Sequence, residues 1–417
     1  MKKSLFLITG FLFFTFSISA QKVEISAEIR PRFENRHGYK TLLNNGEKGA
    51  NFISQRSRVN FNFQQENLTL GIALQNIRVW GDVSTLASDD KANSFHQAWG
   101  EYQFSDNFSL KIGRQEIDYD DSRIFGNVDW AQQARSFDAV IAKIKTSENG
   151  KLDIGYSLNN DSEQLINSLY SNVAGYKTFQ YAWYHTSINN LGLSFLALNN
   201  GVEFLNSNLE EELSYSQTLG SRANFNTGKI SFDAAIYFQT GNVSGNKINA
   251  NYFGGAIDYK ASGEFNLGLG VEYLSGKDMN DSSTKIKSFN PLYGTNHKFN
   301  GLMDYFYVGN HINSVGLLDI NATLGYSKDK FTAKIIPHIF SSAADIYSAG
   351  SKMSTNLGTE VDVVLGYKIA KNVKLNGGFS KMYGTRSLEV LKGGESDLNN
   401  SWTWVMITFK PTLFTSK

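Results

Sequence analysis

The sequence predicts an all-β protein, a closed antiparallel transmembrane β-barrel of about eighteen strands. Three observations predict this fold class. From Val23 to Phe409 short stretches alternate apolar and polar residues, as in Glu264–Tyr273, so each stretch has one apolar and one polar face. Only 4 of the 417 residues are proline, which central strands exclude. The chain also begins with a secretion signal.

That signal is residues Met1–Ala20. Two lysines begin it, Leu5–Phe16 is its apolar stretch, and small residues precede a cleavage point ahead of Gln21. The apolar stretch is shorter than the ~18 residues of a membrane helix, so a retained N-terminal anchor is the less favoured alternative. We therefore expect residues 1–20 to be removed and residues 21–417 to form one outer-membrane barrel domain.

The first predicted strand shows the pattern clearly. In Val23–Arg36 the apolar residues, such as Ile25, point one way and the polar residues, such as Arg30, point the other. The predicted strands are Val23–Arg36, Phe52–Gln64, Leu68–Trp80, Ser94–Phe104, Phe108–Ile117, Phe137–Lys145, Lys151–Asn159, Tyr176–Ile188, Leu191–Asn199, Glu212–Phe225, Lys229–Thr240, Ile248–Lys260, Glu264–Leu274, Val315–Ser327, Lys330–Phe340, Asn356–Ile369, Asn372–Tyr383 and Asn400–Phe409. The apolar phase slips near Gln75, which a β-bulge explains, and it is ambiguous in Tyr176–Ile188.

The connections between these strands alternate in length. Tight turns such as Ser105–Asn107 join some pairs, and longer polar loops such as Tyr39–Asn51 join others. Bacterial barrels have short periplasmic turns and long outer loops. Two insertions, Asp118–Arg135 and Ser288–Asn313, are too long and too aromatic for plain loops. We expect both to fold into the lumen as constrictions.

Composition excludes several classes of protein. There is no cysteine, so no disulfide and no lipid-modified cysteine is expected. The net charge of +1 falls to −1 without the two lysines of the signal, which argues against nucleic-acid binding. No catalytic motif occurs in a fitting context, and the six histidines lack metal-ligand spacing. Asp278–Asp281 could hold calcium, but a solvated acidic loop is the favoured interpretation. We expect no enzyme activity and no cofactor.

Arginine is distributed unevenly: nine of the eleven arginines lie between Arg30 and Arg135. Arginine stays charged and grips carboxylate or phosphate, so a basic wall would attract anionic solutes. The candidate pore-lining, anion-binding residues are Arg30, Arg32, Arg56, Arg58, Arg78, Arg114, Arg123 and Arg135. In the alternative interpretation these arginines pair with acidic residues and only brace a wet interior. The acidic candidates for such pairing are Glu24, Glu28, Glu34, Glu101, Glu116 and Asp138.

Several segments resemble a known family. RPRFENR, RSRVNFNF, LQNIRVWG, KIGRQEIDYDDSRIFGNVDW and ARSFDAV, with FNPLYGTNHKFNGLMDYFYVGN at Phe289–Asn310, are similar to the alginate-export family of outer-membrane barrels in its Bacteroidota form. The resemblance implies an 18-stranded monomeric barrel with an electropositive, arginine-lined pore for an anionic polysaccharide. It places the eight arginines in the lumen. Asp129–Trp130 and Asp138 match family positions without an assigned role. Because only Arg222 and Arg386 follow Arg135, we expect a neutral or lysine-based far wall.

Together these inferences predict a passive channel in the outer membrane. Its expected partners are the lipid bilayer and anionic polysaccharide or small anionic solutes, and we expect a monomer. Two alternatives stay open. One is a non-conducting structural or binding barrel, and the other is a secreted all-β carbohydrate-active protein.

Overall fold

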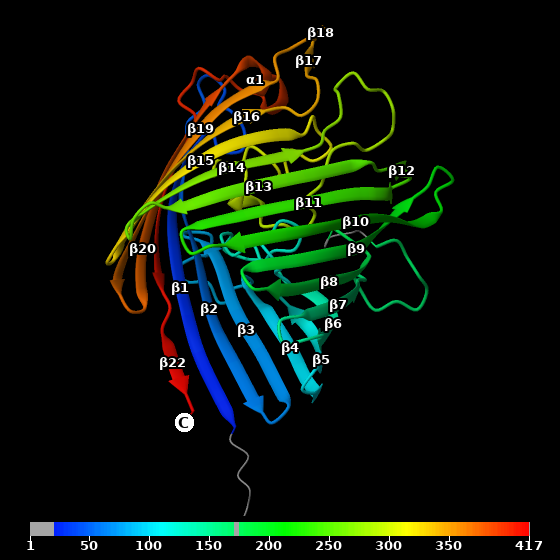
Figure 1. Cartoon of the computed structure of the whole chain (residues 1–417), viewed down its shortest axis with the longest axis vertical. Helices are drawn as coiled ribbons and strands as arrows, with labels where there is room; N and C mark the ends of the chain where they lie inside the picture. The colour runs from blue at the N-terminus through cyan, green and yellow to red at the C-terminus, as the bar shows by residue number, and fades with distance from the viewer. Residues whose placement is uncertain (1–20, 171–174, 417) are drawn as a thin grey trace, which may run out of the picture.

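The computed structural model describes residues 21–170 and 175–416, and these residues form a single antiparallel β-barrel (Figure 1). Eighteen long strands of the described chain build the wall, which confirms the predicted fold class. All eighteen predicted strands are present with ends shifted by a few residues. The signal peptide predicted at residues 1–20 lies outside the described residues.

The long strands follow one another around the barrel. They are β1 (Lys22–His37), β2 (Ala50–Gln65), β3 (Leu68–Val79), β4 (Asn93–Ser105), β5 (Phe108–Gln115), β6 (Phe137–Lys145), β7 (Lys151–Leu158), β8 (Thr178–Ile188), β9 (Leu191–Leu205), β10 (Glu211–Asn226), β11 (Ile230–Val243), β13 (Ala250–Lys260), β14 (Phe265–Leu274), β15 (Leu317–Lys328), β16 (Phe331–Ser341), β19 (Asn356–Ala370), β20 (Val373–Gly384) and β21 (Ser401–Phe409). The short elements are β12 (Asn246–Lys247), η1 (Asn296–Lys298), β17 (Tyr347–Ser348), β18 (Ser351–Lys352), α1 (Arg386–Lys392) and β22 (Thr412–Thr415).

The barrel closes where the first strand meets the last. On one side β1 pairs with β2, and on the other side it pairs with β21 and then β22, with Arg36 opposite Trp402 and Ile25 opposite Phe414. Closure leaves no open sheet edge, which is the condition for strands to cross lipid. Both ends of the described chain lie at the end of the barrel that carries the tight turns, which is the periplasmic end in bacterial barrels (Figure 1). Among the described residues, no helix is long and apolar enough to cross a membrane.

Apolar side chains cover the outside of the barrel. Large apolar residues remain exposed along the outward strand faces: Ile72, Ile112, Phe195, Leu219, Leu269, Ile320, Leu365 and Val405. The residues that alternate with them point inward, and on β1, β2 and β19 these are charged and buried: Glu28, Arg30, Arg32, Arg56, Arg58, Glu360 and Asp362. The expected arrangement of an apolar exterior and a polar interior holds for these strands.

The expectation of a polar interior is wrong for β6, β8 and β9. Their inward faces carry large buried apolar residues: Phe137, Ile141, Phe179, Tyr181, Trp183, Leu196 and Leu198. These side chains pack against other buried residues inside the barrel and are not exposed to water. On β8 the inward face is aromatic, whereas the outward face mixes polar residues such as Gln180 with apolar and aromatic residues such as Ala182 and Tyr184, which explains why the alternation in Tyr176–Ile188 is ambiguous.

We predict that Leu269→Arg on the outward face of β14 destabilises the barrel in lipid vesicles, lowering its free energy of unfolding by ~2–4 kcal/mol, because it places a charge in the hydrocarbon. Thr323→Arg is the matched control. Thr323 lies on β15 beside Leu269 but lines an internal cavity, so its charge stays hydrated. Urea titration of vesicle-inserted protein measures both. Equal losses for the two variants would contradict this assignment of faces.

Candidate permeation pathway

Two segments fill much of the lumen. The first inserted segment, Asp118–Arg135, connects β5 to β6, and the second inserted segment, Ser288–Asn313, connects β14 to β15. They bind each other inside the barrel: Gly126 N donates to Tyr293 O at 2.9 Å, and Thr295 N donates to Ser122 O at 2.9 Å. A Cβ at Gly126 would collide with Thr295, so only glycine allows this approach. The expected folding of both insertions into the lumen is thus seen.

Aromatic packing attaches the first inserted segment to the β6–β8 wall. The Phe125 ring is 1% exposed, and its centroid lies 5.8 Å from that of Phe137, 4.9 Å from that of Tyr181 and 5.4 Å from that of Tyr293. Such edge-to-face and stacked pairs add about 0.5–1.5 kcal/mol each beyond the burial of apolar area. This aromatic core closes one side of the lumen.

The opposite side of the first inserted segment rests on the arginine ladder, which we define as Arg30, Arg32, Arg56 and Arg58. The strands that carry the ladder pair directly, and Arg30 stands opposite Arg56. Two like charges in direct register repel each other, so their pairing requires anions nearby. Glu28 and Asp129 supply them: Arg56 Nε lies 2.8 Å from Glu28 Oε1, and Arg56 Nη2 lies 2.7 Å from Asp129 Oδ1.

The other ladder residues hold the backbone of the same segment. Arg30 Nη2 donates to Asp129 O at 2.8 Å, and Arg32 Nη1 donates to Trp130 O at 2.7 Å. The Arg32 guanidinium also lies 4.1 Å from the centre of the Trp130 ring, a cation–π contact. Gln132 hydrogen-bonds to Arg30 and to Ser54 Oγ. The ladder therefore fixes residues 129–132 across the middle of the barrel.

Three inward arginines of the predicted set have different surroundings. Arg58 donates to Gln75 Oε1 at 2.7 Å. Arg135 donates to the carbonyl of Gly294 at 3.1 Å. Among the ion pairs of residues 21–170 and 175–416, neither Arg58 nor Arg135 takes part. Arg123, by contrast, is fully buried and pairs with Glu272 at 2.8 Å.

The structure places Arg78 and Arg114 on outward faces, unlike the lumen position that we expected. Arg78 shares its face of β3 with Ile72 and Leu74 and pairs with Asp90, and it also lines the outer cavity described below. Arg114 shares its face of β5 with Ile112 and pairs with Asp138 at 2.8 Å, as in the bracing alternative. The reason is strand alternation: the outward face becomes polar near the outer end of a strand, and the composition of these two strands alone did not show where that change occurs.

A cavity lies on each side of the ladder contact. The outer cavity, about 610 Å³, is lined by Arg36, Lys40, Trp130 and Arg135 among others. The inner cavity, about 440 Å³, lies nearer the periplasmic end and is lined by Arg58, Asn60, Asn62, Gln97, Trp99 and Asp129 among others. Residues 127–133 contribute to the lining of both cavities. This part of the first inserted segment is therefore the constriction between them.

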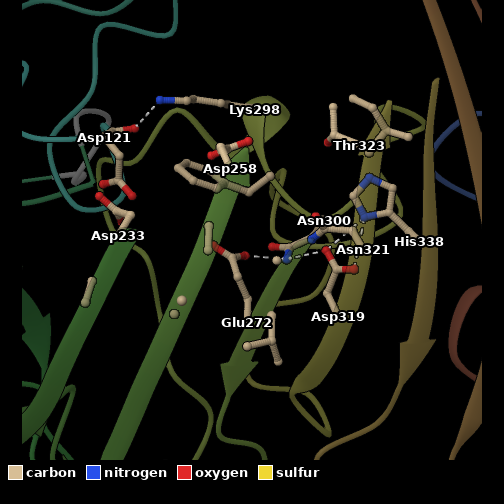
Figure 2. Close-up of a pocket in the computed structure, with 18 of the residues that line it drawn as sticks. Asp121, Asp233, Asp258, Glu272, Lys298, Asn300, Asp319, Asn321, Thr323 and His338 are labelled. Atoms are coloured by element: carbon tan, nitrogen blue, oxygen red, sulfur yellow. Dashed lines mark hydrogen bonds and ion pairs between the residues drawn. The ribbon is translucent and has the colours of Figure 1, made fainter. Parts of the chain in front are cut away.

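The far wall is acidic, so the expectation of a neutral or lysine-based wall is wrong. A third cavity of about 500 Å³ is lined by Asp121, Asp233, Asp258, Glu272, Asp319 and Asp362, with Arg222, Lys298 and His338. Figure 2 shows Asn300 between Glu272 and Asp319, to which it donates at 2.6 and 3.3 Å. Lys298 reaches the Asp121 carbonyl at 2.8 Å (Figure 2). Counting arginines alone missed these carboxylates.

Asp129 is the key residue to which the sequence assigned no role. Burial alone would raise the pKa of its carboxyl, but the charges of Arg56 and Arg30 and a hydrogen bond from Arg56 lower the pKa below its usual range. Asp129 is therefore anionic at neutral pH. The signal in the sequence was an acid followed by two glutamines inside an insertion, in a chain whose first strands are rich in arginine.

For the loop at Asp278–Asp281 we weigh a calcium site against a solvated acidic loop and favour the acidic loop. There Asp281 pairs with Lys287 at 2.9 Å, and Asp278 accepts from the backbone of Asp345. Within the described ranges, no group of three or more His, Cys, Asp or Glu side chains is arranged to hold a metal ion.

We predict that Phe125→Ala increases single-channel conductance in planar bilayers. Loss of the ring from a packed cluster costs about 3–5 kcal/mol, which weakens the attachment of the first inserted segment to the wall. Phe379→Ala is the control, because Phe379 faces outward and is exposed. An unchanged conductance in Phe125→Ala would show that the aromatic core does not position the constriction.

Comparison with known proteins agrees with this architecture. The chain is similar to the crystal structures of OccK9 (OpdG) from Pseudomonas aeruginosa (TM-score 0.63, 13% identity, 94% of this chain and 98% of that one) and OccAB1 from Acinetobacter baumannii (TM-score 0.66, 12% identity, 94% and 97%). It is also similar to OpdK from Pseudomonas aeruginosa with vanillate (TM-score 0.62, 12% identity, 94% and 98%). No curated protein matches the chain.

The family comparison covers most of the sequence. The family model described as alginate export matches residues 21–382. Family and fold together indicate an outer-membrane barrel concerned with transport and not with catalysis. The chain belongs to the alginate export family, and its fold is that of an outer-membrane β-barrel porin.

Proposed function

We propose that the protein is a passive outer-membrane channel for anionic solutes, with acidic polysaccharides or oligosaccharides as the favoured class. The observation that carries this proposal is the presence of an arginine without a carboxylate partner in each cavity. Among the ion pairs of the described residues, neither Arg58 of the inner cavity nor Arg135 of the outer cavity takes part. Arg58 shares the inner cavity with Glu28, Glu116 and Asp129, whereas Arg135 lies in a cavity with excess positive charge, where a guanidinium beside water attracts anions.

The charge of the outer cavity also favours anionic solutes. Five cationic and three acidic residues line it: Arg32, Arg36, Lys40, Arg78 and Arg135 against Glu34, Asp82 and Asp304. A cavity with excess positive charge raises the local concentration of anions. Among the similar structures, that of OpdK contains vanillate, a carboxylate, which is compatible with carboxylate passage through this fold.

The proposal divides the predicted arginines by role. Arg58 and Arg135 contact the solute, whereas Arg30, Arg32 and Arg56 hold the constriction, and Arg123 braces the two inserted segments against β14. Arg114 lies outside this pathway, whereas Arg78 lines the outer cavity and pairs with Asp90. A single closed chain with both of its end strands paired is consistent with action as a monomer.

A second candidate is a barrel that does not conduct. The observation that favours it is the buried contact between the two inserted segments inside the barrel, together with the aromatic core around Phe125. Planar-bilayer recordings separate the candidates, because a non-conducting barrel gives no channel events.

We predict that wild-type protein prefers chloride to potassium in planar bilayers under a KCl gradient. The double variant Arg58→Gln, Arg135→Gln should lower that permeability ratio roughly fivefold. A unit charge ~4 Å from an ion changes its energy by about 1 kcal/mol in a water-like medium. Arg114→Gln is the control, since Arg114 lies on an outward face and lines neither cavity. A reversal potential that the double variant leaves at the wild-type value would rule out the assigned roles.

A further inference from the structure

The Asp129 carboxylate occupies the position that a bound solute carboxylate would take. Its Oδ1 lies 2.7 Å from Arg56 Nη2, and its Oδ2 lies 3.4 Å from Arg30 Nη1. The two guanidinium groups come from neighbouring strands, and both pair with Asp129 on one side and with the buried Glu28 on the other. Paired planar guanidinium groups bind carboxylates from any source in this way.

This carboxylate is accessible, whereas the arginines behind it are not. The Asp129 side chain is 55% exposed, while the side chains of Arg30 and Arg56 are 6% and 1% exposed. Asp129 lines the inner cavity. A solute that enters this cavity therefore reaches Asp129 first, and it reaches the two arginines only when Asp129 moves aside.

The backbone of the first inserted segment can stay in place when the Asp129 side chain leaves. Arg30 Nη2 and Arg32 Nη1 bind the carbonyls of Asp129 and Trp130, and Gln132 binds Ser54. None of these bonds uses the Asp129 carboxylate. Exchange of one carboxylate for another keeps the buried arginines paired, and so it avoids the cost of an unpaired buried charge.

The inner cavity also carries groups suited to hydroxyls. The amide side chains of Asn60, Asn62 and Gln97 line it beside Asp129. Amides both donate and accept hydrogen bonds, as sugar hydroxyls do. The cavity volume, about 440 Å³, falls in the range of roughly 300–1,000 Å³ of small-molecule sites. The amides therefore fit the hydroxyls of a sugar acid, and the two arginines fit its carboxylate. Glu28 and Glu116, with Arg58 and Lys410, also line this cavity.

We propose that Arg30 and Arg56 form a carboxylate-binding subsite that Asp129 fills as an internal competitor, and that the carboxylate of a sugar acid in the inner cavity displaces Asp129 from it. This inference rests on the proposed function and adds its regulation. The channel thereby keeps its buried arginines neutralised when no solute is present. An anion with the geometry of a carboxylate enters the subsite by taking the place of the Asp129 carboxylate.

The test measures glucuronate binding to the purified full-length protein in detergent by isothermal titration calorimetry. Asp129→Asn removes the competing charge but keeps the side-chain size and the backbone bonds of the segment. An internal ligand that fills the site about nine-tenths of the time weakens the apparent affinity about tenfold, so Asp129→Asn should bind glucuronate about tenfold more tightly than wild type.

Asp90→Asn is the matched control. Asp90 is also a loop aspartate paired with an arginine, but that arginine, Arg78, lies on the outward face. Its replacement should leave glucuronate affinity unchanged. Glucose and acetate titrations separate the hydroxyl and carboxylate contributions: only the ligands with a carboxylate should gain affinity in Asp129→Asn, and glucuronate should bind more tightly than acetate.

Each outcome decides the inference. Equal glucuronate affinity of wild type and Asp129→Asn, an equal gain in Asp90→Asn, or no binding to any variant would overturn it. The proposed function is judged separately by the wild-type reversal potential. An anion-preferring channel whose Asp129→Asn variant shows no gain refutes the competitor alone, whereas a channel without anion preference refutes the proposed function and this inference with it.

Discussion

The structure depends on one constraint: backbone hydrogen bonds of strands that cross lipid must all be made within the protein. The pairing of β1 with β21 and β22 meets it, because it removes the two edges that an open sheet would leave. Closure also creates an interior that must be filled or hydrated. The outward faces are mostly apolar, and the buried charges and the two inserted segments are found inside.

The interior is divided by chemistry. The wall of β6, β8 and β9 is aromatic and aliphatic and packs against Phe125 and Tyr293. The wall of β1 and β2 is basic and neutralised by Glu28 and Asp129. The far-wall cavity is acidic. The first inserted segment contacts the apolar and basic walls at once, which is why a loop of polar composition can hold a fixed constriction inside a hydrated barrel.

Much of the fold could be predicted from the alternation of residues. Strand positions, closure and the entry of both insertions followed from period-two patterning and from loop length, since one face of nearly every strand must meet lipid. The prediction was weakest in strand segments whose lipid-facing side is not clearly more apolar than the other side. In β8 the inward face is aromatic and the outward face mixes polar and apolar residues. Near the outer ends of β3 and β5 the outward face becomes polar and carries Arg78 and Arg114.

The sequence by itself determined the barrel, the positions of β1 and β2, and the presence of many arginines on their inward faces, because these depend on neighbours in the chain and on alternation. Only the tertiary structure decided what each arginine binds. Asp129 lies about a hundred residues from Arg30, and Glu272 about a hundred and fifty from Arg123, so no local pattern connects them. Pairing of buried charges depends on distance in space, and that distance is set by how the inserted segments fold back into the closed wall.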